Sequence, residues 1–153
     1  MAPASTAPAN GGAASPAGAA PAPPLRVEFE YVVNAIVPAG GNLSQSLQIQ
    51  QDADFEWVFR IASRTDPRVT VDVSDGATGR KFNSAPVNID NYAGTAQLPF
   101  PLVEPPIIAR SSSINFTFVD SSGAQNTVQL VLSGYKLFPQ ANPAQGSSGL
   151  IQS

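Results

Sequence analysis

The feature that most constrains the fold is an alternation of apolar and polar residues that recurs along the middle of the chain. In several short runs between Arg26 and Phe138, every second residue is apolar, and turn-forming residues separate the runs. A period of two residues is that of a strand with one buried and one solvent-facing side. The clearest apolar rows are Val27, Phe29, Tyr31 and Val33; Phe55, Trp57, Phe59 and Ile61, with Glu56 and Arg60 opposite; Val69, Val71 and Val73; Ile114, Phe116 and Phe118; and Val128, Leu130 and Leu132.

Shorter apolar stretches around residues 43–49, 81–82, 87–89 and 100–103 raise the expected number of strands to about eight. Turn signals lie between the runs, and no window shows helical periodicity with caps. The sequence therefore predicts an all-β fold, an antiparallel β-sandwich. The proline-rich stretch 99–106 cannot lie in a central strand, so we expect it at an edge or between sheets. This favours a jelly roll, and an immunoglobulin-like sandwich is the alternative.

Composition changes abruptly at Leu25. The 24 residues before it include ten alanines and six prolines and carry no charged side chain. Such a segment buries too little apolar surface to offset the entropy of ordering it. We predict an extended or disordered arm over residues 1–24, a sandwich domain over residues 25–138, and a flexible, uncharged tail over residues 139–153.

The inventory of charged and reactive residues excludes several classes of function. The formal net charge of −3, without a Lys/Arg cluster, argues against nucleic-acid binding. The absence of cysteine and histidine excludes disulfides, Cys-ligated metals and a histidine general base. No apolar run reaches membrane-spanning length, and the N-terminus does not resemble a signal peptide. We therefore expect a soluble domain made inside the cell, with no cofactor, nucleic-acid partner or membrane partner.

Three acidic residues, Asp52, Asp54 and Glu56, are candidates for a carboxylate pair or a calcium site because the alternation places them on one strand face. The alternative is a solvated outer face opposite the core row, and we favour it because no second, distant carboxylate is evident. Asp75 and Gly76 predict a turn rather than a calcium loop. No histidine activates a serine, so we predict that the protein is not an enzyme.

Some apolar residues lie outside the alternating runs and are candidates for contact with another subunit. For the residues of the turn- and proline-rich region, the alternative is that they pack on their own sandwich. For the residues of the tail, the alternative is that they belong to a frayed terminus. The complete candidate interface is Leu25, Arg26, Tyr92, Phe100, Leu102, Leu150 and Ile151.

The single tryptophan has two interpretations. Trp57 lies between Phe55 and Phe59 in the alternating row, which favours a place in the core. An exposed Trp57 would instead offer a platform for stacking on a sugar. That alternative would make the protein a tail-associated carbohydrate-binding or receptor-binding module.

Four segments between residues 55 and 138 resemble small structural proteins of tailed-bacteriophage virions. They share an ordered set of short motifs: G-R-x-F-x-S-x-P-V, G-T-A-Q-x-P-F, S-G-A-x-N-T-V and L-x-G-Y-K-L. In this chain the segments read FEWVFRIAS, VDVSDGATGRKFNSAPV, YAGTAQLPFPLVEPPIIARSSSINFTFVD and SSGAQNTVQLVLSGYKL.

The resemblance implies a jelly-roll-type sandwich that decorates or cements the capsid, and it supplies no catalytic residues. The expected partners are the major capsid protein and further copies of this chain, as a trimer or dimer. The expected location is the virion, after synthesis in the host cytoplasm. A pre-extended arm suits this role because it loses little entropy when it docks.

Overall fold

The structure of the protein is a computed structural model that describes residues 20–141. Its compact β unit covers residues 23–140. Most of the predicted arm and tail, with Leu150 and Ile151, lies outside the described residues.

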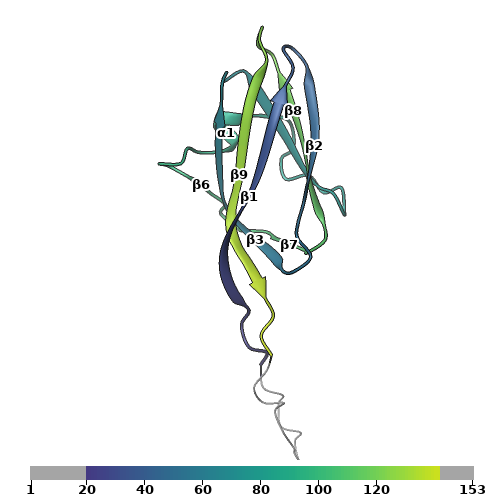
Figure 1. Cartoon of the computed structure of the whole chain (residues 1–153), viewed down its shortest axis with the longest axis vertical. Helices are drawn as coiled ribbons and strands as arrows, with labels where there is room; N and C mark the ends of the chain where they lie inside the picture. The colour runs from purple at the N-terminus through teal and green to yellow at the C-terminus, as the bar shows by residue number, and fades with distance from the viewer. Residues whose placement is uncertain (1–19, 142–153) are drawn as a thin grey trace, which may run out of the picture. The chain divides into compact units, whose positions relative to one another are not determined.

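Two antiparallel sheets form the unit (Figure 1). Sheet A pairs its strands in the order β1-β9-β3-β6, with β7 also on β3, and sheet B has the order β2-β8-β4-β5. The predicted class, an antiparallel β-sandwich, is confirmed. The elements of sheet A are β1 (Leu25–Val37), β9 (Asn126–Phe138), β3 (Asp54–Arg64), β6 (Phe100–Pro101) and β7 (Ile107–Ile108); those of sheet B are β2 (Asn42–Gln48), β8 (Ser113–Asp120), β4 (Val69–Asp75) and β5 (Val87–Asn88), and the short helix α1 is Ile89–Tyr92.

The core lies between the inner faces of the sheets and contains the predicted apolar rows of β4, β8 and β9. In the β1 row Tyr31 and Val33 are buried and Phe29 packs against the core, but the prediction is wrong for Val27, which is 43% exposed. Its largest side chain is Trp57, which is 1% exposed and whose indole N–H donates to the Phe59 carbonyl oxygen at 2.8 Å. The Tyr31 and Phe55 rings meet edge to face at 4.8 Å. Each large side chain buried here contributes about 1.5–3 kcal/mol, so the core supplies most of the driving force for folding.

A β-bulge corrects the predicted alternation in β3. Trp57 pairs with Gly134 but Phe59 pairs with Ser133, so Val58 is an extra residue in the strand. An extra residue exchanges the two faces of a strand beyond it. The prediction that Phe59 and Ile61 continue the core row is therefore wrong. Phe59 is 36% exposed and Ile61 is half-buried, and Arg60 takes the inner side instead.

The proline-rich connection after α1 runs along the free edge of β3, as predicted for residues that cannot lie in a central strand. Leu102 N–H donates to Val58 O at 2.8 Å, and Trp57 N–H donates to Pro106 O at 3.0 Å. These bonds, with the short strands β6 and β7, hold the connection against the sheet.

The first and last strands of the unit pair along their whole length, with Leu25 opposite Phe138 and Val37 opposite Asn126. In Figure 1 the start of β1 and the end of β9 lie together at one end of the sandwich. The chain therefore enters and leaves this unit at neighbouring points.

Candidate interaction site

The three carboxylates of the acidic cluster do not form a shared site, because each faces a separate cation. Among residues 20–141 there is no group of three or more acidic, cysteine or histidine side chains placed to hold a metal ion. The cluster is thus a set of ion-paired surface groups. The pairs are Asp52–Lys136 at 2.7 Å, Asp54–Arg110 at 3.8 Å and Glu56–Arg26 at 2.5 Å.

Four aspartates have a lowered pKa in the fold, Asp52, Asp66, Asp75 and Asp120, and two of them illustrate the expected acid sensitivity. The hydrogen bond from the Arg68 side chain lowers the pKa of Asp66 to about 2, and the hydrogen bond from Lys136 lowers the pKa of Asp52. An unfolded aspartate has a pKa of about 3.9. Because the folded pKa values are the lower ones, the stabilisation is complete above pH 4 and is lost as the pH falls toward 2.

We therefore expect the free energy of unfolding to be nearly constant between pH 5 and 8, where the chain has no histidine to titrate, and to fall below pH 4. Urea denaturation followed at each pH measures this. The Asp66→Asn variant should show a shallower decline below pH 4. An equal decline of the free energy of unfolding in the variant would contradict the assignment of this acid sensitivity to Asp66.

The structure places the predicted interface residues in different environments. Leu25 is 51% exposed, and Arg26 is exposed and paired with Glu56. Phe100 is 44% exposed, whereas Leu102 is half-buried against the core. Tyr92 is only 3% exposed, because α1 packs it into the sandwich, so its ring is not available to a partner's surface.

The burial of Trp57 confirms that it belongs to the core. Its ring offers no open face on which a sugar could stack. The exposed aromatic platform required by the carbohydrate-binding alternative is therefore not present at this residue.

Residues of the predicted interface converge on Arg60. The bulge turns this side chain inward, where its guanidinium carbon lies 4.4 Å from the centroid of the Tyr92 ring and 5.7 Å from that of Phe100. Aromatic faces attract a cation at these distances. The two rings thus hold the Arg60 guanidinium at the β3 edge.

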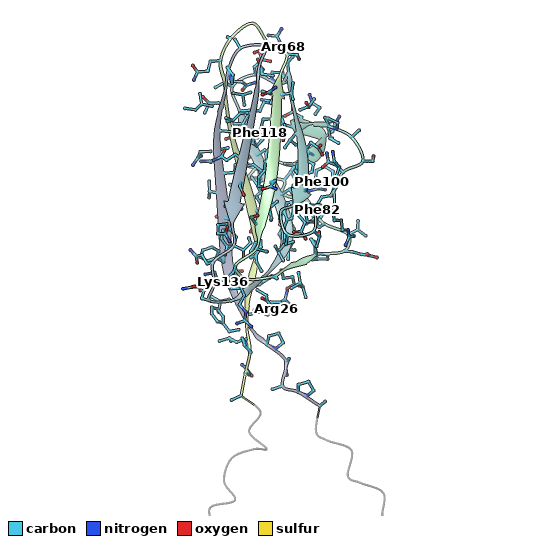
Figure 2. All side chains as sticks on the ribbon, turned by 90° about the vertical axis from the view of Figure 1, so that its right-hand side faces the viewer. Arg26, Arg68, Phe82, Phe100, Phe118 and Lys136 are labelled. Carbon is cyan, nitrogen blue, oxygen red and sulfur yellow. The ribbon has the colours of Figure 1, made fainter. Side chains whose placement is uncertain are left out.

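A pocket of about 190 Å³ opens beside Arg60. Two of its lining residues each have a buried polar atom with no hydrogen-bond partner among the described residues, Arg60 Nε and Tyr92 Oη. Figure 2 shows Phe82 and Phe100 on the same side of the sandwich. The lining residues are Trp57, Arg60, Arg80, Phe82, Tyr92, Leu102, Glu104 and Pro106.

A larger, open hollow of about 530 Å³ also has Phe100 in its lining. Its surface is mostly apolar, from Ala62, Ala93, Leu98 and the prolines beside Phe100, and the ion pair Arg64–Asp90 at 2.6 Å also lines it.

The connection that borders both hollows exposes large apolar side chains. Within ten residues, Leu98 is 78%, Phe100 44%, Val103 99% and Ile107 62% exposed. Single exposed apolar residues are common, but a group of this size in one segment is typical of an interaction surface. We call residues 98–107 the apolar connection.

Sequence reasoning missed Arg60, which the strict alternation assigned to the polar face. One signal was present in the sequence. Trp57, Val58 and Phe59 are three consecutive apolar residues, whereas strict alternation predicts a polar residue at position 58. Such a run is the pattern that an inserted bulge residue leaves in a strand.

The described part of the chain contains no helix long and apolar enough to cross a membrane. Searches against protein-family models and against curated proteins found no match to this chain.

Proposed function

We propose that the protein is a non-enzymatic structural component of a tailed-bacteriophage virion, which binds the capsid surface and stabilises the head. The observation that carries the proposal is the apolar connection, which is both exposed and fixed. Its backbone is hydrogen-bonded to β3, so its apolar side chains are presented without a large further loss of chain entropy on docking.

The strand order supports the jelly-roll class that the virion resemblance implies. Strands β1 to β4 alternate between the two sheets, and the first strand pairs with the last. In an immunoglobulin-type sandwich the first two strands share a sheet. The order therefore favours a jelly roll over its alternative.

The paired ends of the unit support a role for the arm. Residues 1–24 and 139–153 are joined to the sandwich at neighbouring points, since Leu25 lies opposite Phe138. An arm and a tail that start together can engage the same neighbouring subunit. Repetition over a closed shell then multiplies a modest interface, of the order of 1,000 Å², into a large stabilisation of the particle.

Binding to phage heads that lack the protein tests this proposal. We expect the full chain to sediment with heads. When the particles are imaged, it should occupy repeated positions as a dimer or trimer in contact with the major capsid protein. The chain without residues 1–24 should fold normally but bind more weakly. A Leu98→Ser/Val103→Ser double variant should lose about tenfold or more in affinity, because central apolar contacts dominate interface energies.

The matched control is Val119→Ser, which changes another exposed valine, 42% exposed on β8, away from the apolar connection. It should bind as the unmodified chain does. Full occupancy and unchanged affinity for both the truncated chain and the double variant would show that neither segment attaches the protein.

A further inference from the structure

The cations of this chain divide into six that are ion-paired and two that are not. All eight Lys and Arg side chains lie among the described residues. Arg60 and Arg80 form no ion pair within residues 20–141, and these two line the same 190 Å³ pocket. Unpaired cations gathered in one hollow indicate a place for an anion from outside.

The Arg60 guanidinium is held in a fixed orientation. The Tyr92 and Phe100 rings lie 4.4 and 5.7 Å from its central carbon. Contact with ring faces leaves the N–H groups at the edge of the guanidinium free to donate, and Nε is buried without an acceptor. A planar, preorganised fork of this kind matches the two oxygens of a carboxylate.

The Tyr92 hydroxyl is a second donor at the same place. Tyr92 lines the pocket and is 3% exposed, and its hydroxyl has no partner among the described residues. A buried polar group without a partner costs stability, so its persistence here points to a ligand that completes it. Burial raises the pKa of Tyr92 to about 12, although the positive charge of Arg60 acts in the opposite direction. The hydroxyl is therefore protonated at neutral pH.

The charge balance of the pocket favours a monoanion. Arg60 and Arg80 supply two positive charges, and Glu104 supplies one negative charge to the lining. The net charge of the lining matches one carboxylate, and Glu104 repels a dianion such as phosphate.

We propose that the pocket between Arg60, Arg80 and Tyr92 is a carboxylate-binding site. Its ligand is an acidic side chain of the protein that the apolar connection contacts, and this source rests on the proposed function. The carboxylate accepts hydrogen bonds from the Arg60 guanidinium and the Tyr92 hydroxyl, and Arg80 adds charge at the same pocket. Apolar contact and one buried carboxylate together fix the register of docking.

Titration of the full chain with sodium acetate at pH 7 tests the site without any particle. Trp57 is the single tryptophan and lines the pocket, so its fluorescence reports occupancy directly. We expect a saturable change with acetate, a weaker response to phosphate, and none with sodium chloride at matched ionic strength. The absence of a saturable response to acetate, or tighter binding of phosphate, would overturn the proposal.

Three variants and a control separate binding from folding. Arg60→Gln should weaken acetate binding about tenfold or more, and Arg80→Gln and Tyr92→Phe severalfold. Tyr92→Phe removes only the unpartnered hydroxyl, so it should bind less without unfolding at a lower urea concentration. Arg110→Gln, which removes a cation that is paired with Asp54 and does not line this pocket, should bind acetate normally.

If Arg60→Gln does not fold, the other two variants decide the question. Acetate affinity unchanged in Tyr92→Phe and Arg80→Gln would contradict the site. Because acetate binding needs no capsid, its failure leaves the head-binding proposal standing, and a failure to bind heads leaves the carboxylate site standing.

Discussion

A Gly134→Ala variant is expected to lose about 3 kcal/mol or more of its free energy of unfolding. A Cβ atom at this position would lie 1.9 Å from the Glu56 carbonyl oxygen and 3.2 Å from the Phe55 ring. Neither neighbour moves easily, because β9 is paired on both sides, with β1 and β3. The close approach lies next to the bulge at Val58, and the fold requires glycine opposite Trp57.

Urea denaturation, followed by circular dichroism and Trp57 fluorescence, measures the loss. Gly123→Ala is the matched control, since nothing lies within 4 Å of a Cβ atom there. It should stay within about 0.5 kcal/mol of the unmodified chain. Equal unfolding midpoints for the two variants would mean that β3 and β9 do not pair in the register described.

Asn126→Ala is the second change with a large expected effect, a loss of about 3 kcal/mol. Asn126 is fully buried, and its amide joins the start of β9 to the loop after β3 and to the end of β8. Removing it leaves buried donors and acceptors unpaired, and each carries its own cost of desolvation. The amide accepts from Thr65 Oγ1 at 2.9 Å and Asp66 N at 3.1 Å, and donates to Asp66 O at 2.8 Å and Asp120 Oδ1 at 3.2 Å.

The same denaturation experiment applies, with Gln129→Ala as control. Gln129 is also on β9 but is exposed, and its side chain donates to Asn34 alone. Its loss should cost less than about 1 kcal/mol. If Asn126→Ala were no more destabilised than Gln129→Ala, the four hydrogen bonds would not hold β9 to the loop after β3 and to the end of β8 as described.

Much of the fold could be predicted because strand alternation is local and needs no knowledge of partners. The rows that include Val71, Phe116 and Leu130 are buried as predicted. Trp57 is buried for the same reason. The pattern fails beyond Trp57, where one inserted residue exchanges the faces, and in α1, where a single short turn buries Tyr92 without a helical period.

The site was less predictable because it is assembled from distant segments. Arg60 lies in β3, Arg80 lies between β4 and β5, and Tyr92 lies in α1, so only the tertiary fold brings them to one pocket. Sequence reasoning did single out Tyr92, Phe100 and Leu102 as a group, for their apolar character in turn-rich sequence. Their common neighbour, a charged side chain turned inward by a bulge, has no local signature other than the run Trp57–Phe59.

The place of β9 between β1 and β3 also governs when the domain can form during synthesis. The ribosome makes β1 early and β9 last, yet β9 carries the hydrogen bonds that join β1 to β3. Until residues 126–138 emerge, both earlier strands present open edges to solvent, and sheet A lacks the strand that joins them. Folding therefore depends on the most distant pairing in the unit, and the nascent chain is exposed to aggregation until its final strand inserts.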